Sequence, residues 1–336
     1  MRDTGASTQF SYRTGFLKAA FGDLDNCQSP SFRQRFKREN VICSAQTLYH
    51  YTTLAGFQGI VRTGGFWASD SRYMNDAEET VHGRKLALKV IQHRIERTRV
   101  RCFPEILKSV AEKLSREARI GHLVACFSTS RDSLEQWRGY GGSAGVCLAV
   151  NGLTGHSEIS TKVSHEATKS NTPVFVAPDQ VPLEVQYRWR RKATILLSVI
   201  GRFERQYELD RSAMPERWPH DHDEQYVEYL YDTLMHYILI LKNDAFEKEN
   251  EARIVLPYSA IKKFRSGLQF RPSNLGLIPY VCTGDHLGNT GQMPIKEVIV
   301  GPSAHKDLIA ESITTFLEHM GYRDVPVSLS TVPFRS

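Results

Sequence analysis

The sequence has few cysteines, and none of them lies near another in the chain. The six cysteines include no Cys-x-x-Cys pair, which argues against a zinc site, a disulfide-stapled scaffold or an oxidising compartment. Long apolar runs are also missing. The N-terminus builds no secretory signal, and stretches such as 238–241 are too short to span a bilayer. We therefore expect a soluble cytoplasmic protein with no membrane partner.

A strong excess of charge of one sign is lacking as well. Lys and Arg total 43 against 37 Asp and Glu, and the two signs are interspersed along most of the chain. Such a balance permits a nucleic acid or an acidic partner but does not require one. The 336 residues, 41% of them hydrophobic, are enough to fill a substantial core.

Hydrophobic periodicity predicts short strands mixed unevenly with helices. Strands are expected at 48–52, 66–69, 122–128, 145–150, 252–257, 268–271, 297–300 and 325–329. Helices are expected at 54–63, at 75–99 with Asn75 or Asp76 as N-cap, and at 104–119, 183–209, 223–243 and 306–320. This irregular alternation favours an α+β fold over a regular doubly wound one.

Composition also suggests how the chain is organised. Residues 1–45 are mixed and basic and are predicted to be an N-terminal extension. Residues 46–336 are predicted to form a single domain. Its middle, at about 151–245, begins with a polar segment and continues with helical periodicity, which indicates a helical insertion.

Short motifs from about residue 46 to the C-terminus resemble those of one bacterial family. They are Leu48-Tyr-His-Tyr-Thr52, Phe66-Trp-Ala-Ser-Asp70, Tyr73-Met-Asn-Asp76 with Glu78, Ala125-Cys-Phe-Ser128, Gln136-Trp137 with Gly139-Tyr140, Gly145-Val-Cys147, 249–254, Val300-Gly-Pro302 and Ser330-Thr-Val-Pro-Phe-Arg335. On these residues the chain resembles the bacterial domain of unknown function 2971 (DUF2971) family. That name carries no activity.

A second resemblance, to the ADP-ribosyltransferase fold, implies a function. That fold builds its site from three motifs in fixed chain order: His or Arg on a first strand, Ser-Thr-Ser or Tyr on a middle strand, and Glu entering a late strand, often as Glu-x-Glu. Here His50 lies on the first predicted strand, Ser128-Thr-Ser130 ends a middle one, and Glu249-Asn-Glu251 leads into a late one. The resemblance implies a split mixed or antiparallel sheet with covering helices, and NAD as the substrate.

The resemblance also implies a role for each motif. Glu251 would stabilise the positive charge that develops on the ribose as nicotinamide leaves. Glu249, two residues earlier on the same face of an extended segment, would accept a proton from the attacking group. His50 would fix ribose hydroxyls, and the backbone beside it, at Tyr51 and Thr52, would grip the carboxamide.

Other residues complete the expected site. Ser128 or Ser130 would orient Glu251, and Trp67 and Tyr73 are candidates for the pocket wall. No metal is expected, because the two histidines of His220-Asp-His-Asp223 lie in a polar loop and more often face water.

Each motif also has a plain structural explanation. His50 would then be a half-buried strand histidine bonded to the backbone, the glutamates a solvated charge cluster, and Ser128 to Ser130 a strand-ending turn. The chain also departs from the family patterns, because Ser-Thr-Ser usually accompanies Arg, and His usually accompanies Tyr. The acceptor of ADP-ribose, whether a protein, a nucleic acid or water, therefore stays open.

Two functions of different class follow from these residues. The first is an ADP-ribosyltransferase or NAD glycohydrolase, a glycosyl-transferring enzyme acting as a bacterial defence or toxin effector. The second is a non-catalytic module that binds a nucleotide, a nucleic acid or a protein. Arg188, Arg190 and Arg191 flank Trp189, a pattern that suits phosphate and base contacts, although a solvated helix face explains it too.

Overall fold

The computed structural model describes residues 41–74, 77–116, 121–142, 144–151, 181–213, 222–285 and 292–333. The chain divides into two compact units. Unit 1 comprises Met1–Val41, Asp76–Arg119 and Gln186–Asn243, and unit 2 comprises Ile42–Asn75, Ile120–Val185 and Asp244–Ser336. Most of the predicted extension, the predicted N-cap at Asn75 or Asp76, residues 152–180 of the predicted insertion, and His220 all lie outside the described residues.

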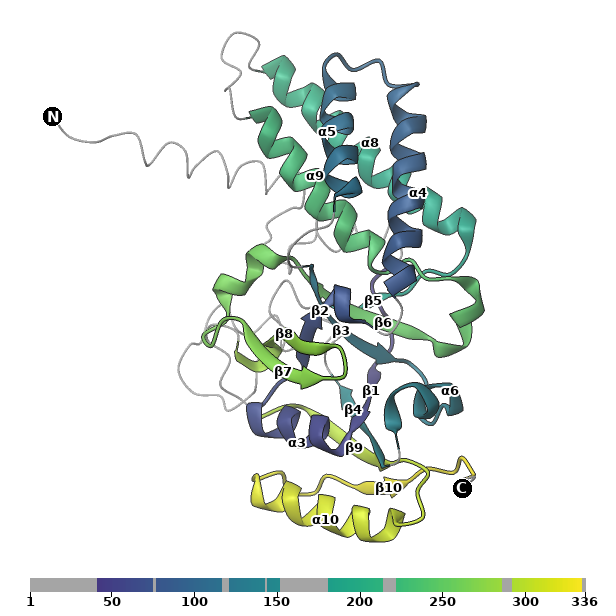
Figure 1. The fold of residues 1–336 in the computed structure, drawn as a ribbon, viewed down its shortest axis with the longest axis vertical. Helices are drawn as coiled ribbons and strands as arrows, with labels where there is room; N and C mark the ends of the chain where they lie inside the picture. Colours follow the sequence, from purple (N-terminus) through teal and green to yellow (C-terminus); the bar gives the residue numbers. More distant parts are fainter. Residues whose placement is uncertain are drawn as a thin grey trace, which may run out of the picture. The chain divides into compact units, whose positions relative to one another are not determined.

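Unit 1 is helical in its described part. Its helices, which lie alongside one another in Figure 1, are α4 (Ala77–Ile95), α5 (Phe103–Ser115), α8 (Trp189–Ala213) and α9 (His222–Ile238). Their apolar stripes form its core, where the rings of Tyr207 and Tyr226 meet edge to face with centroids 5.0 Å apart. The unit therefore draws on two segments of the chain, 76–119 as well as 186–243, and not only on the region predicted as an insertion.

Unit 2 contains a mixed, mostly antiparallel ten-stranded sheet, and the protein is α+β as expected. Its strands are β1 (Thr47–Thr53), β2 (Trp67–Asp70), β3 (Leu123–Ser128), β4 (Gly145–Asn151), β5 (Leu183–Glu184), β6 (Glu251–Leu256), β7 (Gln269–Ser273), β8 (Gly276–Cys282), β9 (Ile295–Val300) and β10 (Val327–Leu329). The main path runs β10-β9-β4-β1-β3-β2-β8-β7, while β6 pairs with β3 and β5. Of the pairs described, only β9 with β10 is parallel.

The sheet of unit 2 has one strongly apolar face. Helix α3 (Leu54–Thr63), which Gly64 ends in the left-handed conformation as the sequence suggests, packs there beside α10 (Lys306–His319). The rings of Phe57 and Phe316 join the two helices, with centroids 5.9 Å apart. On the other face, the π-helical turn Trp137–Gly141 packs Trp137 against Tyr51.

The sheet is joined at its centre by a single residue pair. Strand β1 pairs with β4 over its whole length, but with β3 only through Tyr49 and Ser128. Beyond that pair the same edge of β3 is taken by β2, at Ser69 and Asp70. We call the gap that opens between β1 and β3 after Tyr49 the seam. It divides the sheet into a β1-β4-β9-β10 half and a β5-β6-β3-β2-β8-β7 half.

Candidate functional site

The three strands that carry the predicted motifs are neighbours in the sheet. Strand β6 pairs with β3 along six residues, which sets Glu251 directly opposite Ser128. Ser128 in turn lies opposite Tyr49 of β1. Residues opposite each other on paired strands share one face of a sheet. Glu251, Ser128 and Tyr49 therefore form one row across three strands.

His50 points away from this row. Side chains alternate along a strand, so His50 lies on the opposite side of β1 from Tyr49. Its ring contacts Phe66 and Phe127, with centroids 5.0 and 5.6 Å away, and both phenylalanines belong to the core beneath α3 and α10. The structure thus brings Ser128 and Glu251 together but directs His50 into the seam, toward the other face.

The imidazole of His50 is held neutral. Its Nδ1 lies 2.8 Å from the carbonyl oxygen of Cys126, so Nδ1 carries the proton and donates. The pKa of His50 is lowered from 6.5 to about 4. Burial is the main cause, opposed by that hydrogen bond, and the charge of Arg271 contributes to the lowering. Nε2 is consequently left as a hydrogen-bond acceptor.

The Ser128 to Ser130 segment is bonded mainly to backbone. Ser128 Oγ donates to the carbonyl oxygen of Glu249 over 2.7 Å and accepts from the amide of Ser130. Tyr51 donates its hydroxyl to the carbonyl oxygen of Ser130 over 2.8 Å. Asn250 Nδ2 lies 3.1 Å from Ser130 Oγ. These contacts fix the end of β3 against the beginning of β6.

Glu251 is buried in a two-pronged ion pair. Arg253 Nε and Nη2 donate to its two carboxylate oxygens over 2.7 and 2.8 Å, and both side chains are only 3% exposed. The two residues are two apart on β6 and so share a face. This fork–fork geometry is the strong form of an Arg–carboxylate contact.

Glu249 does not share a face with Glu251, and the expectation of an extended segment from 249 to 251 is wrong. Glu249 is the last residue of the 3₁₀-helix Asp244–Glu249. Asn250 has a φ of 45°, so the backbone turns there before β6 begins. Asparagine tolerates this conformation better than most residues, which is a signal that the sequence does contain.

The remaining predicted site residues are spread over unit 2. Thr52 lies on β1, on the same side as His50, opposite Val146. Tyr73 ends the 3₁₀-turn Ser71–Tyr73, where the guanidinium of Arg72 lies 5.6 Å from its ring centroid. Trp67 begins β2 and lies beside Tyr280 of β8.

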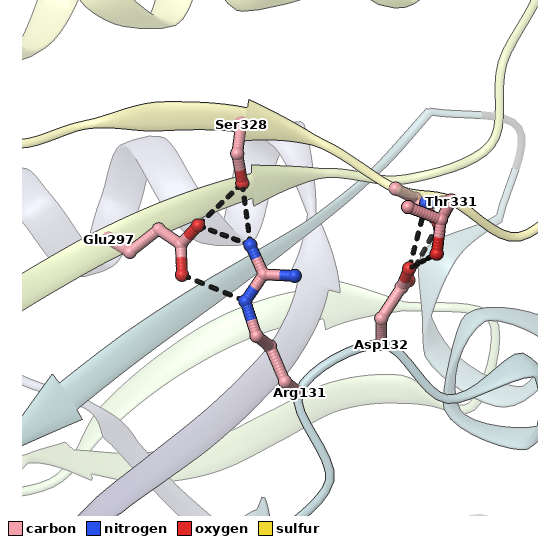
Figure 2. Close-up of polar contacts among 6 residues, drawn as sticks. Arg131, Asp132, Glu297, Ser328 and Thr331 are labelled. Atoms are coloured by element: carbon pink, nitrogen blue, oxygen red, sulfur yellow. Dashed lines mark hydrogen bonds and ion pairs between the residues drawn. The ribbon is translucent and has the colours of Figure 1, made fainter.

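A polar anchor behind the Ser128 to Ser130 segment could not be read from the sequence. Figure 2 shows Arg131 forked onto Glu297 of β9, at 3.1 and 2.5 Å, and also reaching Ser328 of β10. Beside it, Asp132 accepts from the amide and hydroxyl of Thr331, both over 2.8 Å. The chain near its C-terminus is thereby fastened to the loop that follows Ser130.

Asp132 accepts two more hydrogen bonds, one from the turn that follows it and one from the chain near the C-terminus. Trp137 Nε1 donates to it over 2.7 Å, and Ser330 Oγ over 2.6 Å. Burial alone raises the pKa of Asp132, but the hydrogen bonds from Ser330, Trp137 and Thr331 outweigh burial and lower it overall. Asp132 is therefore a carboxylate anchor for the site loop.

A family model described as "Protein of unknown function (DUF2971)" matches residues 136–254. Those residues belong to the DUF2971 family. Neither the curated proteins nor the solved structures include a match.

The DUF2971 segment covers only part of the candidate site. It begins at Gln136, runs through β4, α8 and α9, and ends at Ile254 within β6. Glu249, Glu251 and Arg253 lie inside it, whereas His50 and Ser128 precede it. The description attaches no activity to any of them. Across the described residues, no helix is long and apolar enough to cross a membrane.

Arg271 is a further polar residue that the sequence did not single out. It lies on β7, and its Nη2 donates to Ser69 Oγ of β2 over 3.2 Å. Burial lowers the pKa of Arg271, opposed by the nearby Tyr280. Ser69 lies opposite Val124 of β3, which in turn lies opposite Val255 of β6. Ser69 therefore shares a face of the sheet with Arg253 and Glu251.

Proposed function

We propose that unit 2 binds NAD and cleaves its bond between ribose and nicotinamide, as an ADP-ribosyltransferase or NAD glycohydrolase, with Glu251 as the essential carboxylate. One observation supports this most. Motifs separated by about 200 residues in the sequence lie on adjacent strands in the order β6, β3, β1, with Glu251 directly opposite Ser128. The seam after Tyr49 also supports the proposal, because the ADP-ribosyltransferase resemblance implies a split sheet.

The chemistry requires a carboxylate beside the ribose, and the proposal gives this role to Glu251. The bond from ribose C1′ to the nicotinamide nitrogen breaks, nicotinamide leaves neutral with the bonding electrons, and the sugar becomes cation-like. A fixed carboxylate stabilises that charge better than freely rotating water. An acceptor hydroxyl, amine or water then bonds to C1′ and loses a proton, for which Glu249 is the nearby base in the chain.

Two further residues have roles in this proposal. His50, neutral and with Nε2 free to accept, would take a hydrogen bond from a ribose hydroxyl across the seam. Ser128 is a positioning residue, because its hydroxyl holds the backbone that leads into Glu251.

Arg253 sets a condition on catalysis. Its guanidinium occupies both oxygens of Glu251, so a ribose hydroxyl has to displace one prong of the fork. In exchange, the two-pronged ion pair holds the Glu251 side chain in one orientation. NAD is a substrate here and the reaction needs no metal. A bacterial cytoplasmic effector acting on the NAD pool would fit this activity.

The test is nicotinamide release from NAD by the purified full-length chain, alone and with cell lysate. Glu251→Gln should abolish release, while the matched change Glu247→Gln, at an exposed glutamate before β6, should leave it intact. Glu251→Gln leaves Arg253 with an unpaired charge, which by itself can destabilise the protein. The double variant Glu251→Gln/Arg253→Gln removes that charge, and thermal unfolding of each protein shows whether it is folded. No release by the wild type, or equal release by Glu251→Gln, refutes the proposal.

A non-catalytic binding module is the second candidate, and a specific observation favours it. Both oxygens of Glu251 are already bonded, and His50 faces away from it. On α8, the ring of Trp189 is 58% exposed between Arg188 and Arg190, an arrangement that suits stacking on a base beside a phosphate. Stabilisation by RNA or DNA but not by NAD, lost when Arg188, Arg190 and Arg191 are changed to Gln, would establish this function instead.

A further inference from the structure

Arg271 is a partly buried cation that has no anionic partner among the described residues. Its Nε is buried and has no hydrogen-bond partner, and no described residue forms an ion pair with it. Within the described part of the chain, its one hydrogen bond goes to a neutral hydroxyl, Ser69 Oγ. Removing a guanidinium from water without pairing it is costly, so such a group is retained where a ligand supplies the charge.

Two aromatic rings share a face of the sheet with this cation, and one of them, Tyr280, is its neighbour. Trp67 and Tyr280 are 4.9 Å apart between centroids with an interplanar angle of 33°, and both are partly exposed. Trp67 is held in place, because Nε1 donates to Thr63 Oγ1 over 3.2 Å and the ring lies against Gly59, where a Cβ would be 2.2 Å away. Tyr280 is close enough to Arg271 for each to alter the pKa of the other.

The ligand can be deduced from these groups. A guanidinium with free donors matches the oxygens of a phosphate, and a neighbouring hydroxyl adds a further donor. A rigid aromatic pair offers a flat surface to a planar base. We infer that Arg271 and Ser69 bind a phosphate of a nucleotide whose base stacks on the Trp67–Tyr280 pair.

This inference deepens the proposed function but can be tested separately. Ser69 shares a face with Glu251 and Arg253 through the register of β2, β3 and β6. The pyrophosphate of NAD would therefore bind on the same side of the sheet as the reacting ribose. Glu251 governs bond cleavage, whereas Arg271 governs affinity for the phosphate.

The experiment measures binding of ADP, inorganic pyrophosphate and adenosine to the full-length chain by calorimetry. Arg271→Gln should weaken ADP and pyrophosphate by about tenfold or more and leave adenosine unchanged. Arg265→Gln, the same change at an exposed arginine ahead of β7, should alter none of the three. Trp67→Leu should weaken ADP and adenosine alike.

The unfolding temperature distinguishes a ligand-binding arginine from one that only stabilises the fold. Without ligand, Arg271→Gln should melt at the same temperature as the wild type or higher, because an uncompensated charge is removed. If that variant does not fold, Arg271→Lys, which keeps the charge but loses the fork, should still weaken pyrophosphate binding several-fold.

Two outcomes would overturn the inference. One is no binding of ADP or pyrophosphate to the wild type, and the other is equal binding to the Arg271→Gln and Arg265→Gln variants. Binding through Arg271 without Glu251-dependent release of nicotinamide would leave the phosphate site standing and refute the NAD-cleaving function. Glu251-dependent release of nicotinamide, together with ADP binding that does not depend on Arg271, would support the NAD-cleaving function and refute the phosphate site.

Discussion

The neutral imidazole of His50 makes a quantitative prediction about stability. Its pKa is about 4 in the folded protein and 6.5 when unperturbed. Between these values the unfolded chain binds a proton that the folded chain does not, so stability falls as the pH falls. Full stability is present above about pH 6.5, and loss continues down to about pH 4.

The size of the effect follows from the same two values. Proton linkage through one group with this shift lowers the free energy of unfolding by about 2 kcal/mol between roughly pH 7.5 and pH 5. His50→Gln should remove this dependence, because an amide does not titrate in that range and its NH₂ can still donate to the Cys126 carbonyl.

The assay is urea unfolding of both proteins at several pH values, read as the difference between them. Subtracting the curves cancels the other histidines and the carboxylates common to both. As the pH is lowered, the unfolding free energy of the wild type should fall relative to that of the His50→Gln variant. If unfolding free energy plotted against pH gave parallel curves for the two proteins from about pH 7.5 to pH 5, His50 would be protonated as easily as in the unfolded chain. The placement of its ring between β1 and β3, shielded from water, would then be wrong.

Three further predictions concern the packing around the site. Asp132→Asn should lower the free energy of unfolding, measured in urea, by roughly 2 kcal/mol, because a neutral amide cannot accept from Trp137, Ser330 and Thr331 together. The control is Asp324→Asn, the same change at an exposed site with positive φ, which should have little effect. Arg253→Met should lower the free energy of unfolding by about 3 kcal/mol, because it leaves the buried Glu251 carboxylate without its ion-pair partner. The Glu251→Met/Arg253→Met double variant should recover part of this loss, and additive losses would contradict the ion pair. Gly59→Ala should lower the melting temperature, because its Cβ would meet the Trp67 ring at 2.2 Å. The control is Gly201→Ala in α8, where the nearest atom is 3.8 Å from the added Cβ, and this change should raise the stability by roughly 1 kcal/mol and the melting temperature with it.

Periodicity was enough to locate most elements of unit 2. The strands at 123–128, 145–151 and 251–256 and the helices at 54–63 and 306–319 lie within a few residues of their predicted positions. Their alternating or helical apolar pattern is a local property of the chain. Strand β8 at 276–282 was missed, because Pro279 and the Gly276 turn argue against a strand. Strand β5 is only two residues long and carries no periodicity.

The candidate site depended on features that are not local. Arg271 gave no signal because nothing in Phe-Arg-Pro distinguishes an unpaired cation from a solvated one. Its significance arises when β8 and β2 bring Tyr280 and Ser69 beside it. Asp132 is likewise explained by Thr331, 199 residues away. Such pairings follow from the order of strands in the sheet, which periodicity does not specify.

The orientation of His50 illustrates the same limit at the scale of one residue. The motif order places β6, β3 and β1 side by side, but a shift of one residue in register turns a side chain to the other face. Because Tyr49 pairs with Ser128, the side chains of β1 on the Glu251 side include those of Tyr49 and Tyr51. A ligand on that side would meet these tyrosines first and reach His50 only through the seam. Loss of affinity on changing Tyr49 to Ala would thus place the ligand on the Glu251 side, and loss only in His50→Ala would place it in the seam.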